Sequence, residues 1–369
     1  MKAAALPFLA LPLTCVAVAL ALAGWRAPAP AAQPPADGSS DYHARFVAPV
    51  NGWLPADGDD PRPGFDVRNC PRVSEIYDLA PAKDAIPALQ APQFTPAADA
   101  LWLDDRAPVL GLKLGGESRC YPLALMNWHS LVHDTLGGQG VYVFLDPPSG
   151  LAVARRMMSK SRPMALAGYG ARGVGLTYEI ATGRLYDMLD GAYLNGPLPA
   201  TGFGSGDTDW LPLERMTWRQ WRTLHPSTLV LSRDTGRNFD YTFDPYSAAA
   251  LGPGGSAENY WISDTLLAPE ALRDKTQALP DKSMVLGLLV KDEVWAVPLD
   301  ALREARTVEF TTATGDKITV HGDAATDCYY AEDKNGHQPP QVRLFWYAWK
   351  AHFPNAKVYR KSETIETDG

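Results

Sequence analysis

Residues 109–150 read VLGLKLGGESRCYPLALMNWHSLVHDTLGGQGVYVFLDPPSG, and their changes of hydrophobic period decide the fold we expect. Alternating apolar and small or polar positions predict strands at residues 109–114 and 120–123. The apolar run at residues 141–145 predicts a buried strand, and the turn after it leads to a strand at residues 151–155. Between the second and third strands, residues 125–132 change to a helical spacing. Gly115 and Gly116 predict a hairpin turn, and DPPSG at residues 146–150 predicts a stiff one.

Two sets of landmarks recur along the chain. The motif VLGL at residues 109–112 returns at residues 285–288, and Trp218 with Trp221 returns as Trp346 with Trp349. The offsets are 176 and 128, so the second copy is shorter by 176 − 128 = 48 residues. A residue type kept in both copies indicates packing, and we expect these four tryptophans in the core.

The second copy has no clear counterpart of the helix near residues 127–134 or of the DPPSG turn. We therefore expect an α+β fold of two related lobes, mainly antiparallel strands with short helices. A candidate site belongs in the first lobe, because parts peculiar to one copy are not needed by the scaffold.

The N-terminus resembles an export signal. Lys2 precedes an uncharged apolar run up to Trp25, long enough to serve either as a cleaved signal peptide or as a membrane anchor. The predicted divisions are a signal or anchor at 1–26, a Pro/Ala-rich tether and irregular wrap at 27–80, a first lobe at 81–260, and a second, shortened lobe and tail at 261–369. We expect an exported protein, periplasmic or extracellular, that meets the membrane only through its N-terminal segment.

Charge and cysteine content exclude some functions. The 369 residues carry a formal net charge of -8 and no basic stripe, which argues against a nucleic-acid partner. Beyond the signal the cysteines are Cys70, Cys120 and Cys328, and the sequence cannot say which two of them pair. We expect the partner to be a small molecule or another exported protein.

His129 and His133 are the candidate metal ligands. Four residues apart on one helix, both rings could face a single ion, and Asp134 or Asp146 could add an oxygen. The cofactor would then be a divalent metal. The alternative is one packed and one exposed histidine with no metal, so no cofactor is certain.

The DPPSG turn and a polar-aromatic cluster are the other candidates. Asp146 could act as a general base with Ser149 as a hydrogen-bond donor, or both could cap turn amides. The candidate ligand-binding residues combine guanidinium, carboxylate and aromatic groups, as a binding cleft would; they are Trp128, His129, Arg233, Asp234, Tyr241, Asp244 and Tyr246. The alternative for residues 233–246 is a buried ion-pair lock between the lobes.

The chain resembles the family called domain of unknown function 3179. The matching motifs are Asn127-Trp128-His129, Lys83-Asp84 with residues 86–89, Thr182-Gly183, residues 218–226, and TLVLSRDTG at 228–236 with Asp244-Pro245-Tyr246. The resemblance covers about residues 81–361. It implies an exported bacterial protein and no defined reaction.

The chain also departs from the pattern of that family. Family members typically have Cys-Pro-x-Cys-Gly where this chain has DPPSG, so the resemblance implies that thiol chemistry has been lost here. A polar stretch before Tyr178 is replaced by Arg172-Gly173-Val174. We therefore predict a ligand-binding or degenerate-site member. The alternatives are a divalent-metal enzyme using His129 and His133, and a membrane-tethered structural or assembly factor.

Overall fold

A computed structural model describes residues 73–79, 83–157, 162–194, 210–246 and 260–361. Strands hold 42% and helices 13% of the described residues. The predicted antiparallel strands with short helices are confirmed. The helical share is too low for the predicted α+β class, and the fold is mainly β. The predicted signal or anchor, most of the tether and Cys70 lie outside the described residues.

No helix in the described part of the chain has the length and apolar character needed to cross a membrane. The first unit, as we define it, consists of β3 (Pro108–Leu114), β4 (Glu117–Pro122), α2 (Leu123–His129), β5 (Leu131–Leu136), β6 (Gln139–Asp146), β7 (Leu151–Arg156), β12 (Trp210–Leu211), β13 (Leu213–Thr217), α3 (Trp218–Leu224) and β14 (Leu229–Leu231). Before it come β2 (Phe94–Pro96) and the short helix η2 (Ala97–Asp99).

The second unit consists of β15 (Met284–Val290), β16 (Glu293–Pro298), α4 (Ala301–Ala305), β17 (Thr307–Thr311), β18 (Lys317–Asp323), β19 (Cys328–Asp333), β20 (Gln341–Phe345), α5 (Trp346–His352) and β21 (Lys357–Val358). The short helix η4 (Glu270–Leu272) precedes it. A separate side sheet is formed by β1 (Ile76–Asp78), β8 (Met164–Ala171), β9 (Val174–Glu179), β10 (Leu185–Asp187) and β11 (Ala192–Tyr193), with η1 (Val73–Glu75) leading into it.

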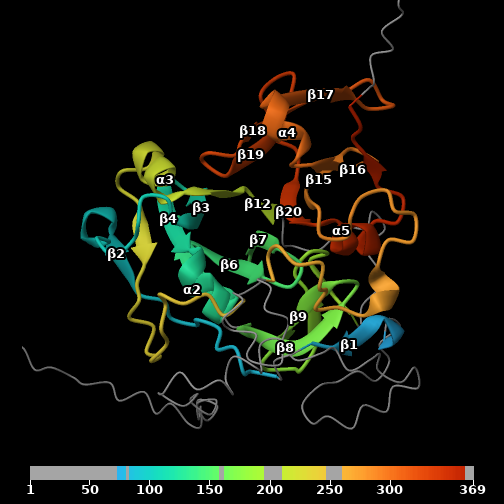
Figure 1. The fold of residues 1–369 in the computed structure, drawn as a ribbon. Coiled ribbons are helices and arrows are strands. Elements are labelled where there is room, and N and C mark those ends of the chain that lie inside the picture. Colours follow the sequence, from blue (N-terminus) through green and yellow to red (C-terminus); the bar gives the residue numbers. More distant parts are fainter. Residues whose placement is uncertain (1–72, 80–82, 158–161, 195–209, 247–259, 362–369) are drawn as a thin grey trace, which may run out of the picture.

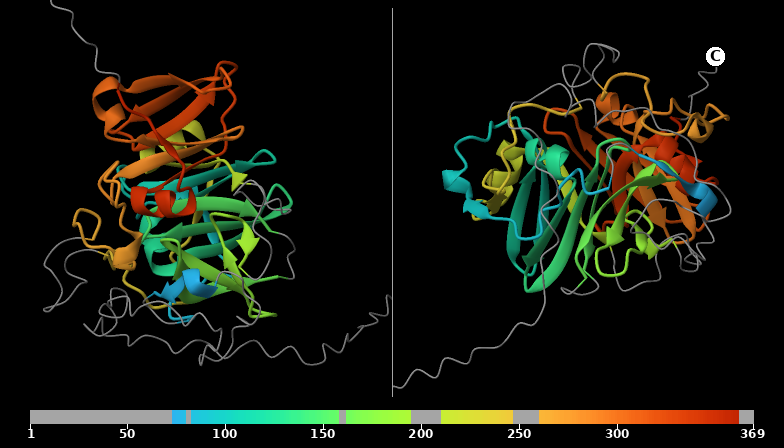
Figure 2. Two further views of the ribbon diagram at one scale, coloured as in Figure 1. Left: turned by 90° about the vertical axis from the view of Figure 1, so that its right-hand side faces the viewer. Right: turned by 90° about the horizontal axis from the view of Figure 1, so that it is seen from below.

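The largest sheet crosses from one unit to the other. Its order is β21-β16-β15-β20-β7-β6-β5, with β12 also paired to β7. A second sheet has the order β13-β3-β4-β14-β2, and a third contains β17, β18 and β19. The third sheet and the side sheet lie at opposite ends of the molecule, at the top and bottom of Figure 1. The left view of Figure 2 shows α5 between these two ends.

The two units share strand directions and register. Gly111 of β3 lies opposite Cys120 and Glu214, and Gly287 of β15 lies opposite Ala296 and Val342. These pairs differ by the sequence offsets of 176 and 128. The last strand of each unit is parallel to its neighbour, β14 to β4 and β21 to β16.

The glycine of each VLGL motif leaves space for a tryptophan ring of the same unit. A Cβ on Gly111 would lie 2.3 Å from the ring of Trp221, and one on Gly287 would lie 2.6 Å from that of Trp349. Only a residue without a side chain leaves room for the indole at these points. Trp218, Trp221, Trp346 and Trp349 are fully buried, which confirms their expected place in the core.

The helix predicted at 125–132 is partly a strand. It ends at His129, because Ser130 has a left-handed φ of 55° and β5 follows. Ahead of the first tryptophan pair, residues 213–217 form β13, and α3 begins at Trp218. The second unit also has counterparts that we did not expect: α4 follows β16 as α2 follows β4, and residues 324–327 join β18 to β19 as residues 147–150 join β6 to β7.

The turns at residues 147–150 and 324–327 each accept a backbone hydrogen bond from the other unit. Phe345 N–H of the second unit donates to Ser149 O in the turn of the first, at 2.7 Å. Thr217 N–H of the first unit donates to Thr326 O in the turn of the second, at 2.9 Å. Position 345 is 217 plus the offset of 128, so equivalent strand ends make equivalent contacts. Each unit therefore supports a turn of the other.

Candidate functional site

His129 and His133 do not lie on one helix, so the spacing argument for a metal pair is wrong. His129 ends α2 and His133 lies in β5. The His129 ring is hydrogen-bonded to Pro87 O at 2.8 Å and Tyr241 OH at 2.7 Å. His133 Nε2 accepts from Met164 N–H at 3.0 Å, and its Nδ1 lies 3.3 Å from Leu89 O. Burial lowers the pKa of both rings to about 4.

Asp134 faces away from His133, because neighbouring strand residues point to opposite faces. Its carboxylate accepts from Tyr121 OH at 2.8 Å and lies 3.3 Å from Arg119 Nε. Burial raises its pKa, although these partners oppose the rise. The three predicted metal ligands are therefore not brought together, and each has its own partners.

The segment that follows β14 packs against the end of α2. Tyr241 contacts His129, the backbone O of Phe243 accepts from Trp128 Nε1 at 3.0 Å, and Asp244 accepts from Asn127 at 3.2 Å. Tyr246 is buried beside it. Arg233 and Asp234 are exposed and stand apart from these contacts. The predicted cluster is thus divided: its aromatic residues and Asp244 pack at α2, whereas Arg233 and Asp234 face solvent.

The DPPSG turn is buried in the centre of the molecule. Ser149 Oγ donates to Asp146 Oδ2, and Gly175 N–H donates to the same oxygen at 3.1 Å. Pro148 O accepts from Tyr260 OH at 2.5 Å and Tyr347 OH at 2.8 Å. Burial raises the pKa of Asp146 to about 6 against these hydrogen bonds. Asp146 and Ser149 are therefore hydrogen-bonded to each other and to backbone groups, as the alternative of capping turn amides predicted.

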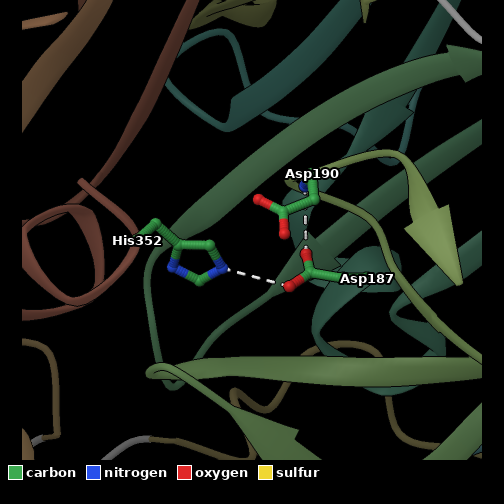
Figure 3. A group of neighbouring side chains, drawn as sticks. All are labelled: Asp187, Asp190 and His352. Carbon is green, nitrogen blue, oxygen red and sulfur yellow. Dashed lines mark hydrogen bonds and ion pairs between the residues drawn. The ribbon is translucent and has the colours of Figure 1, made fainter. Parts of the chain in front are cut away.

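A buried ionic network beside this turn was not anticipated. His352 at the end of α5 places Nε2 3.1 Å from Asp187 Oδ2, and its Nδ1 is 2.9 Å from Ala348 O. Figure 3 shows the imidazole directed at one oxygen of Asp187, with Asp190 above that carboxylate and its backbone nitrogen directed at the other oxygen. Asp187 Oδ1 accepts the backbone N–H groups of Leu189 and Asp190. The side chains of Asp187 and His352 are both fully buried.

Arg172 supplies the positive charge of this network. Its guanidinium lies 3.0 Å from Asp187, contacts Asp190, and lies 3.2 Å from Glu75. Burial alone would raise the pKa of Asp187, but His352 and Arg172 hold it well below its ordinary range. The carboxylate is therefore ionised and paired on both sides.

Among the described residues, Asp187, Asp190 and His352 are the group whose ligand atoms are close enough for one metal ion, all within 4.8 Å. A cation there would meet the guanidinium of Arg172 on the same two carboxylates. Like charges at that range repel strongly in a buried site. The residues fit an arginine-centred network better than a metal centre.

One weak signal for this network is present in the sequence. Arg172 is a departure from the family pattern, whereas Asp187 and Asp190 belong to none of the motifs described above. His352 lies 165 positions from Asp187. No local spacing connects residues so far apart.

An open groove lies between the two units. Its volume is about 710 Å³. The charged lining residues are Lys113, Arg155, Glu214, Arg215 and Arg343. Its apolar and aromatic lining includes Leu110, Leu211, Leu213, Leu286, Leu289, Trp210, Tyr329 and Tyr330. We call this the inter-unit groove.

The cysteines do not pair among the described residues. Cys120 is buried and Cys328 is half-buried, and both are free. Burial raises the pKa of Cys328 to about 11, so its thiol is protonated at neutral pH. A reactive thiolate is therefore not supported at this groove-lining position.

Comparison with known proteins identifies a family and no individual relative. Neither curated proteins nor solved structures give a match. The model of a family described as "Protein of unknown function (DUF3179)" matches residues 83–339. This match spans well over half of the 369 residues. The chain therefore belongs to the DUF3179 family, as its motifs indicated.

Proposed function

We propose that this protein is an exported binding protein that holds a small molecule in the inter-unit groove. The observation that carries the proposal is the groove itself, about 710 Å³ and lined from both units. Ligand pockets in proteins have volumes of about 300–1,000 Å³ and often lie where two structural units meet. Its mixture of leucines, aromatic rings and a few charged groups is typical of such pockets.

The central network favours binding over catalysis. Asp187 and His352 are enclosed and paired, and Asp146 with Ser149 is equally buried. A general base must reach the proton that it abstracts. We therefore assign the network and the DPPSG turn a structural role, joining the side sheet to α5 and fixing the units that form the groove.

We further propose that the two units are copies of one ancestral segment. The matched register of β13-β3-β4-β14 and β20-β15-β16-β21 supports this origin, as do the reciprocal turn contacts. The groove would then lie near the axis that relates the copies. Export rests on the signal-like N-terminus, and N-terminal sequencing of the mature protein from its native host would test it.

Binding in the groove can be tested with a neutral fluorescent dye. We expect the full chain to bind one Nile red molecule, with Leu213→Trp abolishing the binding because the larger ring fills the groove. Leu224→Trp is the matched control, since Leu224 is 55% exposed on α3 and lies outside the groove. A dye signal that Leu213→Trp leaves unchanged would contradict this location.

A further inference from the structure

The inter-unit groove contains a pair of equivalent arginines. Arg215 lies opposite Leu110 in the first unit, and Arg343 lies opposite Leu286 in the second. The offsets of 128 and 176 relate these pairs. All four residues line the groove. The same strand position of each unit therefore gives the groove one guanidinium and one leucine.

One carboxylate serves both arginines. Asp327 Oδ2 lies 2.7 Å from Arg215 Nε, and Asp327 Oδ1 lies 2.9 Å from Arg343 Nη2. Arg343 also donates to Asp327 O at 2.9 Å. Two guanidiniums against one carboxylate leave a positive charge uncompensated. Arg343 Nε is moreover buried without a hydrogen-bond partner.

The rest of the charged lining does not cancel this excess. Among the described residues, Lys113 also lines the groove, and Glu214 is the acidic lining residue. These two balance each other, so Arg215, Arg343 and Asp327 leave a surplus of one positive charge. Positive charge buried at Arg343 is stabilised by an anion.

We infer that the ligand of the inter-unit groove is an organic anion with an apolar body, an inference that rests on the proposed function. Its acidic group binds at Arg215 and Arg343, because a guanidinium presents paired donors that match the two oxygens of a carboxylate. Its apolar part lies against Leu213, Leu289 and the ring of Tyr330, which line the groove and are only half-buried. An inorganic anion would leave this apolar surface in water.

The test compares two probes of one shape. Isothermal titration calorimetry of the full chain with 2-naphthoate and with neutral 2-naphthylmethanol separates the contribution of the charge to binding from that of the ring. We expect naphthoate to bind at least ten-fold more tightly. Arg215→Met should remove that preference and leave the alcohol unaffected, while Arg215→Lys should restore part of it. Arg219→Met is the matched control, because Arg219 is exposed on α3 and lies outside the groove.

The outcomes distinguish the inference from the proposed function. Equal binding of both probes, lost in Leu213→Trp, would overturn the anion and keep the groove as a binding site. A naphthoate preference that survives in folded Arg215→Met and Arg343→Met would also overturn the inference. Failure of naphthoate, naphthylmethanol and Nile red to bind would overturn both. Circular dichroism of each variant confirms that it is folded.

Discussion

The helices α3 and α5 begin with matched tryptophans and end in opposite surroundings. Trp218 and Trp221 correspond to Trp346 and Trp349, and all four are buried. At the last position, however, α3 has Leu224, 55% exposed, and α5 has His352, 7% exposed. One helix faces solvent and the other packs on the side sheet. The two helices thus differ in role because different segments pack against their last residues.

This comparison bears on the prediction that a candidate site belongs in the first lobe. His352 and Tyr347 of α5 reach the Asp187 network and the DPPSG turn. Strands β8–β11 of the side sheet, inserted in sequence between β7 and β12, have no counterpart in the second unit. It accounts for part of the 48-residue difference. The Asp187 network and the DPPSG turn therefore depend on the side sheet and on α5 of the second unit.

The largest expected effect on stability comes from exchanging the residues at the last positions of α3 and α5. His352→Leu should lower the free energy of unfolding by about 3–5 kcal/mol, because it removes one partner of a buried charge. Leu224→His should change it by less than about 0.5 kcal/mol, since that position is exposed. Urea denaturation measures both. Similar losses in the two variants would contradict the different roles of α3 and α5.

The turns differ in how they respond to pH. The pKa of Asp146 rises from 3.8 to about 6 on folding, so its protonated form stabilises the fold. This contribution is present below pH 3.8 and is lost as the pH rises through 6. Between pH 4 and pH 7, the wild type should therefore lose about 3 kcal/mol relative to Asp146→Asn.

The matched control is Asp323→Asn, at the half-exposed start of the second turn. Urea denaturation at both pH values gives the comparison. The reverse sign for Asp146→Asn, with the wild type gaining stability as the pH rises, would show that Asp146 is stabilised as the carboxylate.

The glycines test where the units are alike. Gly111→Ala and Gly287→Ala each place a Cβ within 2.3–2.6 Å of a tryptophan ring. Overpacking of this kind costs about 1–3 kcal/mol, and the two losses should agree to within about 1 kcal/mol. Thermal and urea unfolding of both variants would measure them. A loss confined to one unit would break the equivalence.

The smallest effect concerns the end of α2. His129→Ala gives α2 the residue that α4 has at the matched position, Ala305. We expect a loss of about 1–2 kcal/mol, because a buried carbonyl and a tyrosine hydroxyl lose a partner. Metal analysis of the same samples, purified without a histidine tag, tests the metal prediction. A stoichiometric metal present in the wild type and lost in the variant would restore that prediction.

Local sequence patterns predicted the local structure well and the site poorly. The VLGL strands, the Gly115-Gly116 turn and the tryptophan core followed from short-range periodicity, which backbone geometry imposes directly. The prediction from the helical spacing of His129 and His133 failed, because that spacing continues past Ser130 in the sequence while the backbone changes to β5 there. The positive φ of Ser130 ends the helix, and a serine in the sequence does not predict a positive φ.

By itself, the sequence determined the strand hairpins, the recurrence of VLGL with its tryptophans, the surplus of acidic residues and membership of a family. Each depends on neighbours along the chain or on matched motifs. The tertiary structure alone brought His352 to Asp187, Arg215 to Arg343 through Asp327, and the two turns to opposite units. The physical reason is that ion pairs and grooves form between strands distant in sequence, where packing and not spacing sets the distance.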